Sequence, residues 1–284
     1  MDGRFAPSPT GVLHLGNLRT ALLAWLFARS AGSRFLVRME DLDRGRSRER
    51  FVDEQLADLA AVGLDWDGEV VFQSQRTARY EAALERLPLY ECFCTRAEIR
   101  EAASAPHGPL PEGAYPGTCR TLGEDQRAAR RAEGRVPALR VDAGGAVVSF
   151  TDRLLGPYTG LVDDFVVRRG DGGFAYNLAV VVDDAEQGVE EVVRGADLID
   201  STPRQLWLAG ALGVPAPAHA HVPLVLGPDG SRLAKRHGAV TLRDVAPSDA
   251  VRWMLASLGL PSGDPADFDP DRLAQEPAVF GQNP

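Results

Sequence analysis

The chain has 284 residues, of which 44% are hydrophobic and 25% are charged, and its formal net charge is −9. This length suits one large or two modest globular domains, and the composition excludes disordered and fibrous proteins. The acidic balance argues against a general nucleic-acid coat, although it leaves room for a local basic groove. The N-terminus lacks a signal-peptide pattern and no apolar run is long enough for a membrane span, so we expect a cytoplasmic protein.

The N-terminal third alternates between strand and helix. Apolar residues recur at helical spacing in three stretches, and short apolar runs separate them. The pattern predicts strands at 4–7 and 34–39, and helices at 14–32, 48–62 and 77–87. Such alternation is typical of a doubly wound, parallel α/β sheet.

The middle of the chain differs from its two flanks. Residues 88–160 hold all the cysteines, a Pro/Gly-rich stretch at 105–117 and strand-like runs at 136–141 and 146–150. We interpret this region as an insertion that is small enough to need a metal ion for its stability.

Strand–helix alternation returns after the insertion, with strands expected at 165–168, 189–194 and 222–226 and helices near 202–212 and 248–258. The domain boundaries that follow are a first half of a nucleotide-binding domain at 1–87, the insertion at 88–160, a second half at 161–245 and a short helical tail at 246–284.

The three cysteines, Cys92, Cys94 and Cys119, lie within 28 residues of one another. An odd number of cysteines in a cytosolic chain is poor material for disulfides, whereas closely spaced thiolates can share one tetrahedral zinc ion. A fourth ligand is then needed, and ligand chemistry favours His107 over Tyr115 or a carboxylate. Three buried, inert thiols are the alternative.

Lys235 is the single lysine among 31 basic residues. Arginine presents a rigid fork, whereas lysine is a compact charge on a flexible stem. The exception suggests a task such as reaching a moving phosphate, although a lone lysine in a surface loop is equally consistent with chance.

The first strand-to-helix connection carries His14, Gly16 and Asn17, while the chain has neither a P-loop nor a GxGxxG fingerprint. Ligands of open α/β sheets bind at the carboxyl ends of strands, where helix N-termini attract phosphate. A histidine and an amide there can donate to phosphate oxygens, and a glycine leaves room for a base. Alone, the motif is weak, because most histidines in such a position are capping or surface residues; its value comes from its combination with Lys235.

Several motifs in order resemble the glutamyl-class class I aminoacyl-tRNA synthetases. RFAPSPTGVLHLGN resembles the opening signature of that family and RLAKR its lysine-bearing second signature, while VRMEDLDR, DDFVVRRGDGGFAYNLAVVVDD and VVRGADLIDSTPRQ match between them. QSQR, RGADLI and the Cys-x-Cys…Tyr-x-x-x-Cys pattern resemble one branch, the glutamyl-Q tRNA(Asp) synthetases. The resemblance covers about 240 residues, since it extends from the first signature to the second.

The resemblance implies a Rossmann-like catalytic domain with an inserted zinc module and no anticodon-binding domain. It implies an enzyme that activates L-glutamate with ATP and Mg²⁺, without tRNA, and transfers the glutamyl group to queuosine in the anticodon loop of tRNA(Asp). We expect it to act as a monomer.

The resemblance also implies the site residues. Catalysis and ATP binding fall to His14, Asn17 and Lys235, with Gly16 at the ATP. The glutamate residues are Arg4, Phe5, Ala6, Pro7, Ser8, Glu40, Tyr176 and Arg194. Glutamate has two carboxylates and one ammonium group, so its pocket needs arginine forks and an acidic partner. The zinc ligands would be Cys92, Cys94, Tyr115 and Cys119, with Tyr115 preferred over His107.

The sequence departs from the family pattern in two places: the spacing from Cys94 to Tyr115 carries an extended Pro-rich loop, and the second signature differs. Arg232 and Ala234 stand where the family has lysine and serine, and loss of the hydroxyl could slow closure of the loop. A truncated glutamyl-tRNA synthetase and a non-catalytic paralogue acting as a binding module are the alternatives. RGADLI and the shortness of the chain argue against the first, and the intact His14 and Lys235 against the second.

Two charged segments receive structural interpretations. The pair Asp183–Asp184 ends an apolar run and is expected to emerge into water rather than to bind a metal. The arginine-rich stretch 127–135 is expected to be a solvated helix rather than a tRNA grip.

Overall fold

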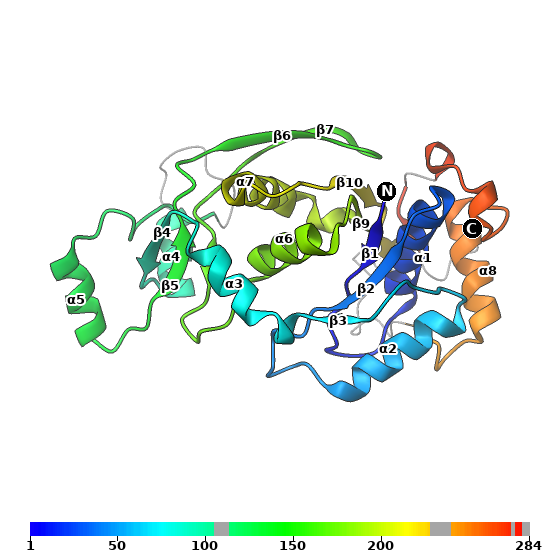
Figure 1. Ribbon diagram of the computed structural model, residues 1–284, viewed down its shortest axis with the longest axis horizontal. Helices are drawn as coiled ribbons and strands as arrows, with labels where there is room; N and C mark the ends of the chain where they lie inside the picture. Colours follow the sequence, from blue (N-terminus) through cyan, green and yellow to red (C-terminus); the bar gives the residue numbers. More distant parts are fainter. Residues whose placement is uncertain (105–113, 228–239, 274–275, 280–284) are drawn as a thin grey trace.

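A five-stranded parallel sheet, the central sheet, organises the fold (Figure 1). The computed structural model describes residues 1–104, 114–227, 240–273 and 276–279. The strand order is β10-β9-β1-β2-β3, and each neighbouring pair is parallel. The strands are β1 (Gly3–Phe5), β2 (Phe35–Met39), β3 (Val71–Phe72), β9 (Glu191–Gly195) and β10 (Ala218–Val222).

Helices cover both faces of the central sheet (Figure 1). On one side α1 (Leu15–Ser30) packs on β1 and β9, with α2 (Glu49–Ala61) and α8 (Pro247–Leu258) beyond it; on the other lie α3 (Thr77–Leu84), α6 (Tyr176–Gln187) and α7 (Thr202–Leu212). Each side has its own hydrophobic core, around Leu22 and Leu178 respectively. The expectation of a doubly wound parallel sheet is confirmed.

A second region lies beyond α6 and α7, at the left of Figure 1. The strands β4, β5 and β8 form an antiparallel sheet, and β6 and β7 form a two-stranded ribbon. The turn of this ribbon reaches back to the central sheet, where Arg153 N donates to His219 O at 2.8 Å. The bounds in this region are β4 (Leu89–Cys92), α4 (Arg96–Ser104), α5 (Glu124–Ala132), β5 (Ala138–Val141), β6 (Val147–Asp152), β7 (Gly156–Leu161) and β8 (Val166–Arg168).

The helix α5 confirms the interpretation of the arginine-rich stretch. None of its residues is buried. Arg131 pairs with Glu91 and Glu124, and Arg130 pairs with Glu133. The stretch is therefore a solvated helix, and Arg130 and Arg131 form ion pairs with acidic residues of the same chain.

Two expectations differ from the structure. The single strand expected at 222–226 is two strands, because Pro223 has no N–H to donate: Val222 ends β10, while β11 (Val225–Leu226) pairs with β12 (Ala278–Val279). The pair Asp183–Asp184 does not emerge into water. Asp183 is 0% exposed, because cationic and hydroxyl donors from other elements surround it.

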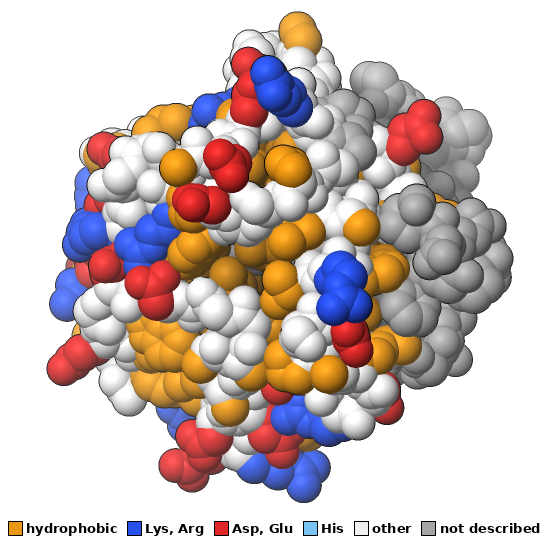
Figure 2. All heavy atoms as spheres, turned by 90° about the vertical axis from the view of Figure 1, so that its right-hand side faces the viewer, with side chains coloured by type: hydrophobic (Ala, Val, Ile, Leu, Met, Phe, Trp, Pro, Cys, Tyr) orange, Lys and Arg blue, Asp and Glu red, His pale blue; other side chains and the backbone are white. Residues whose placement is uncertain are grey.

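The segment 246–273 closes the α1 side of the molecule. The helix α8 buries Ala250, Met254 and Leu258 against the first core, and its C-cap is Gly259 in the left-handed region, at φ 68°. Figure 2 faces this end, where hydrophobic side chains gather between charged ones. Half-buried residues that pack on the core there are Val251, Trp253, Leu255, Leu260 and Phe268. Among the described residues, no helix has the length and apolar character to cross a membrane.

Candidate active site

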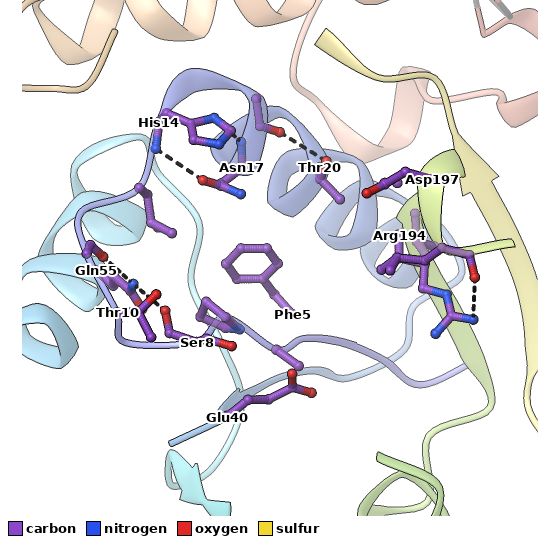
Figure 3. A pocket seen from close by; sticks show the side chains of 18 of the residues that line it. Phe5, Ser8, Thr10, His14, Asn17, Thr20, Glu40, Gln55, Arg194 and Asp197 are labelled. Carbon is purple, nitrogen blue, oxygen red and sulfur yellow. Dashed lines mark hydrogen bonds between the residues drawn. The ribbon is translucent and has the colours of Figure 1, made fainter. Parts of the chain in front are cut away.

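A cleft of about 660 Å³ opens where the carboxyl ends of β1 and β9 meet the N-terminus of α1 (Figure 3). Parallel sheets place their ligand sites at this edge, because the strand ends and helix N-termini converge there. Its volume falls in the range of small-molecule sites. Eleven of the residues predicted for the site line it: Arg4, Phe5, Ala6, Pro7, Ser8, His14, Gly16, Asn17, Glu40, Tyr176 and Arg194.

The remaining predicted residues fall elsewhere. Lys235, together with Arg232 and Ala234, lies outside the described residues, and so does His107. The predicted metal ligands lie in the second region, away from the cleft lining.

Arg4 brings a buried cation to the cleft. It lies on β1 and is 4% exposed, and its Nε donates to Asp184 Oδ1 at 3.3 Å. Within the described chain, neither Nη atom of Arg4 has a hydrogen-bond partner. Because a buried guanidinium normally satisfies its donors, these two N–H groups are available to an anion in the cleft.

Glu40 brings a half-buried carboxylate to the same end of the cleft. Its backbone N–H donates a hydrogen bond to Pro7 O at 2.9 Å, whereas its side chain accepts no hydrogen bond from any described residue. The nearest cationic atom is Arg38 Nη2, 3.7 Å from Oε1. Burial outweighs the neighbouring arginines and raises the pKa of Glu40 to about 7. A cationic group of a ligand would supply the missing donors.

Arg194, near the end of β9, contributes a second buried guanidinium. Each of its three nitrogens makes one short hydrogen bond: Nε donates to His221 Nε2 at 3.1 Å, Nη1 to Gln205 Oε1 at 2.8 Å and Nη2 to Thr202 Oγ1 at 2.8 Å. Its contacts to Tyr176 Oη and Leu198 O are long, at 3.4 and 3.5 Å. Burial lowers the pKa of Arg194, but arginine keeps its proton in proteins. The weakly engaged N–H groups can turn to a ligand.

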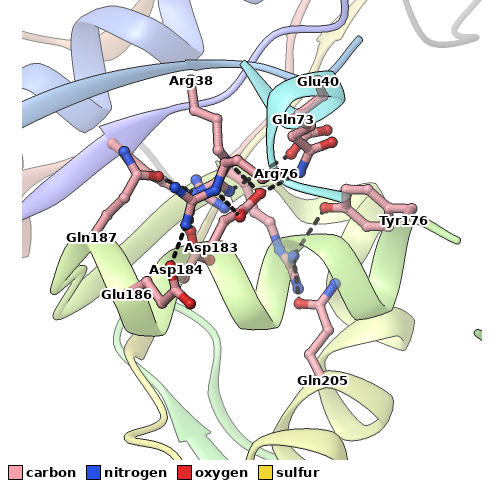
Figure 4. A network of polar contacts seen from close by, with 12 residues as sticks. Arg38, Glu40, Gln73, Arg76, Tyr176, Asp183, Asp184, Glu186, Gln187 and Gln205 are labelled. Atoms are coloured by element: carbon pink, nitrogen blue, oxygen red, sulfur yellow. Dashed lines mark hydrogen bonds and ion pairs between the residues drawn. The ribbon is translucent and has the colours of Figure 1, made fainter. Parts of the chain in front are cut away.

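A buried polar network lies beside Arg4 and Glu40 (Figure 4). Asp183 accepts from Gln73 Nε2 at 2.9 Å, Arg76 Nε at 2.5 Å and Tyr80 Oη at 2.8 Å. Asp184 accepts from Arg38 Nη1 at 2.7 Å and from Arg4. Although burial opposes its charge, these two arginines lower the pKa of Asp184. Through Asp184, the network holds the Nε atom of Arg4 in place. It also places charged side chains close to the cleft.

The other end of the cleft is built on the N-terminus of α1. His14 and Asn17 form a reciprocal capping box, in which His14 Nδ1 accepts from Asn17 N at 3.3 Å and Asn17 Oδ1 from His14 N at 3.2 Å. A neutral His14 ring therefore carries its proton on Nε2, and the Asn17 amide keeps its NH₂ group as a donor. A Cβ on Gly16 would lie 3.1 Å from the His14 ring, so glycine permits this packing.

The loop that joins the two ends is held by a buried side chain of α2. Gln55 Nε2 donates to Ser8 O at 3.1 Å and to Gly11 O at 2.7 Å. Ser8 itself is exposed, and the Phe5 ring faces the middle of the cleft (Figure 3). The strand end and the loop thus present one polar and one aromatic surface to a ligand.

Sequence reasoning missed the opposite wall of the cleft, formed by Val193, Gly195, Asp197, Leu198, Leu224 and Val225. Val193 and Gly195 lie in β9, Asp197 and Leu198 follow it, Leu224 precedes β11 and Val225 is its first residue. A Cβ on Gly195 would lie 2.6 Å from Asp197 Oδ1 and 3.0 Å from Leu224 Cδ2, so any larger residue would displace one of these side chains. The signal that could have found them is their position just after predicted parallel strands.

The three cysteines come together in the second region. Their Sγ atoms lie within 4.8 Å of one another, and Cys94 Sγ is 3.4 Å from Cys119 Sγ. Tyr115 Oη completes the cluster, 3.4 Å from Cys92 Sγ and 3.7 Å from Cys94 Sγ. Ligands of a tetrahedral zinc ion, with Zn–S near 2.3 Å, are separated by roughly 3.8 Å. The four donor atoms could therefore hold zinc after modest adjustment.

Comparison with known proteins agrees with this architecture. The family model described as "tRNA synthetases class I (E and Q), catalytic domain" matches residues 1–260. The glutamyl-Q tRNA(Asp) synthetase of Nocardia farcinica is 61% identical, over 99% of this chain and 93% of its own length. That of Symbiobacterium thermophilum is 55% identical, over 86% of this chain and 80% of its own length.

A solved structure is similar along nearly the whole chain. It is a glutamate tRNA ligase from Elizabethkingia meningosepticum in complex with its amino acid, with a TM-score of 0.81 and 26% identity over 99% of this chain and 67% of that one. The resemblance inferred from the motifs is confirmed: the chain belongs to the class I glutamyl and glutaminyl tRNA synthetases and, within them, to the glutamyl-Q tRNA(Asp) synthetases.

Proposed function

We propose that this protein activates L-glutamate with ATP in the absence of tRNA and transfers the glutamyl group to queuosine at the wobble position of tRNA(Asp). The observation that carries the first half is the pairing of Arg4 and Glu40 at one end of the cleft. A buried cation and a half-buried anion both have unused hydrogen-bonding capacity there. The names of the relatives support the choice of acceptor.

Glutamate fits the charged end of the cleft by chemistry. Its carboxylates match the guanidinium groups of Arg4 and Arg194, and its ammonium group matches the carboxylate of Glu40. Tyr176 and Ser8 would supply hydroxyl contacts, and Phe5, Ala6 and Pro7 the adjoining wall. ATP would then occupy the end beside His14, Gly16 and Asn17.

The chemical step needs positioning and charge stabilisation rather than a protein nucleophile. The substrate carboxylate is ionised at neutral pH and attacks the α-phosphate directly. Negative charge grows on the phosphate oxygens as pyrophosphate leaves, and His14 and Asn17 can donate to them. Lys235, outside the described residues, would add its charge from the second signature. Mg²⁺ enters with ATP as the counter-ion of the phosphates.

The cysteine cluster would form a structural zinc module within residues 88–160. Three thiols and a phenol that converge on one point suit a closed zinc site, which has four protein ligands and no open position. Burial, with the neighbouring thiol groups, raises the pKa of Cys94 to about 12, so binding of the metal must displace its proton. Because ATP and tRNA are its substrates, the cytoplasm is the compartment we propose.

A two-stage assay tests the function. In the first stage, glutamate-dependent exchange between ATP and pyrophosphate is measured without tRNA, and we expect exchange. In the second, glutamyl transfer is measured to tRNA(Asp) with and without queuosine, and we expect transfer only to the modified tRNA. Exchange that requires tRNA(Glu) would support an ordinary synthetase, and no exchange under either condition would support a binding module.

A further inference from the structure

A buried chain of three side chains extends from the rear of the cleft to the β6–β7 ribbon. His221 Nδ1 lies 2.6 Å from Asp152 Oδ2, and His221 Nε2 lies 3.1 Å from Arg194 Nε. The side chains of Asp152 and His221 are both 0% exposed. Asp152 is the last residue of β6, at the turn of the ribbon, so a region distant in the sequence reaches the support of Arg194.

The hydrogen-bond partners fix the protonation of His221. Arginine has donors only, so the Nε2 atom that faces Arg194 Nε must present its lone pair. The ring proton is therefore on Nδ1 and points to Asp152. The Thr202 hydroxyl oxygen accepts from Arg194 Nη2 at 2.8 Å and lies 3.2 Å from His221 Nε2. The hydroxyl proton of Thr202 can therefore also donate to the Nε2 lone pair.

Asp152 is suited to hold this tautomer. Although burial opposes its charge, hydrogen bonds from His221 and from the backbone N–H groups of Leu154 and Leu155 lower its pKa. His219 stacks on His221, with the ring centroids 5.9 Å apart and the planes at 6°. Burial, with the charge of Arg194, lowers the pKa of His219 to about 3, so this neighbour is neutral at pH 7.

The consequence for Arg194 is a restrained guanidinium. Arg194 donates three short hydrogen bonds, one from each nitrogen, to His221, Gln205 and Thr202. The two long contacts, to Tyr176 and Leu198, leave the remaining N–H groups weakly engaged. Without an acceptor at Nε, the guanidinium could rotate and use its strong donors elsewhere.

We propose that His221 is a positioning residue which, oriented by Asp152, holds the Arg194 guanidinium for a carboxylate of glutamate. This inference rests on the proposed function. It predicts that glutamate affinity depends on an acceptor at the position of His221 Nε2, and on the tautomer that Asp152 imposes.

Two amide substitutions separate the halves of this role. His221→Asn leaves a donor near the Nδ1 position and removes the acceptor for Arg194, whereas His221→Gln places an amide oxygen near the Nε2 position and weakens the contact with Asp152. His219→Asn, on the same strand, is the control for loss of a buried imidazole. Exchange between ATP and pyrophosphate gives KM for glutamate, KM for ATP and kcat, and thermal unfolding gives Tm.

We expect His221→Asn to raise KM for glutamate about tenfold with little change in KM for ATP. We expect His221→Gln to raise KM for glutamate less than threefold and to lower Tm more, because it disturbs the buried Asp152. His219→Asn should lower Tm alone. A merely structural role would make KM follow Tm, so equal KM values in the two His221 variants would overturn the inference.

Asp152→Asn tests the same chain if His221→Asn does not fold. An asparagine amide can donate to Nδ1 and so favour the tautomer with Nε2–H facing Arg194; we expect KM for glutamate to rise about fivefold. A wild-type KM in this variant would overturn the inference. Absence of exchange in the unmodified protein is a different result: it would overturn the proposed function, and this inference with it.

Discussion

Asp183 and Glu40 are carboxylates with little exposed surface, 0% and 12% of their side chains, and they lie in contrasting surroundings. Asp183 accepts hydrogen bonds from Gln73, Arg76 and Tyr80, whereas the Glu40 side chain accepts none from the described residues. The arginines differ in what they face. Arg38 is 0% exposed, and its charge pairs with Asp184 at 2.7 Å and with Asp183 at 3.7 Å, although its Nε and Nη2 atoms make no hydrogen bond. Arg4 has two nitrogens without a partner among the described residues, and it lines the cleft. A carboxylate whose hydrogen bonds are satisfied within the protein, such as Asp183, stabilises the fold. A carboxylate beside a cavity that lacks donors, such as Glu40, has hydrogen-bonding capacity for a ligand.

The largest effect that would test this contrast is on Arg4. We expect Arg4→Gln to lower kcat/KM for glutamate in the exchange assay by about 10²-fold or more, because truncating one partner of a buried charge pair costs about 2–5 kcal/mol. KM for ATP should change far less. Arg38→Gln is the matched control, with a larger loss of stability than Arg4→Gln. A small effect of Arg4→Gln on glutamate would remove it from the pocket.

The second test exchanges charge for amide in the two carboxylates. We expect Asp183→Asn to lower the free energy of unfolding by about 3 kcal/mol, since it leaves Arg76 and Arg38 short of a counter-charge in the interior. Glu40→Gln should not lower it, because the Glu40 charge lacks donors in the free protein. Urea unfolding at pH 8 measures both. Equal destabilisation by the two variants would contradict the contrast.

The sequence predicted the fold and most of the cleft residues, but not which charged groups are satisfied within the protein. Alternation of strand and helix was enough for the parallel sheet, and the position of His14 after the first strand was enough to suggest a phosphate site. The motifs brought Arg4, Glu40 and Arg194 into consideration, and the structure lines one cleft with all three. These inferences depend on local patterns, which a sequence displays directly.

The burial of Asp183 could not be predicted in this way. Its partners lie 103 to 110 residues away, on η1 (Gln73–Gln75), α3 and the turn between them, and their approach depends on the packing of α3 against α6. The Asp152–His221 pair is similar, because its residues are 69 positions apart. A charge at the end of an apolar run is usually solvated, and only tertiary contacts reverse that tendency.

The third test uses the pKa of Glu40. Burial raises this pKa to about 7, so Glu40 is neutral below pH 7 and charged above it. If the charged form binds the ammonium group, KM for glutamate should fall about tenfold from pH 6 to pH 8, the change expected for one group titrating near 7. The charged groups that face it are Arg38, Arg4, Asp184 and Asp183.

Glu40→Gln is the control for this pH dependence. It should show a high KM that is nearly independent of pH. The stability of the wild-type protein should change in the opposite direction to its affinity for glutamate. Between pH 4.5, the usual pKa of a glutamate, and pH 7, the folded state retains a proton that the unfolded state releases. Stability therefore falls as the pH rises through this range. A pH profile of KM that persists in Glu40→Gln would assign it to another group.

The smallest effect concerns the choice between Tyr115 and His107 in the cysteine cluster, where the contrast between satisfied and unsatisfied groups recurs. The Tyr115 hydroxyl accepts from Cys119 N at 2.8 Å and lies against two sulfurs, so it is already placed where a fourth ligand is needed. We expect Tyr115→Phe to weaken zinc binding about tenfold, since three thiolates and a water can still hold the ion.

His107→Ala should leave the zinc content unchanged, whereas Cys119→Ala should abolish stoichiometric binding. Metal content after dialysis against a graded chelator measures all three, and loss of zinc in His107→Ala with retention in Tyr115→Phe would reverse the assignment.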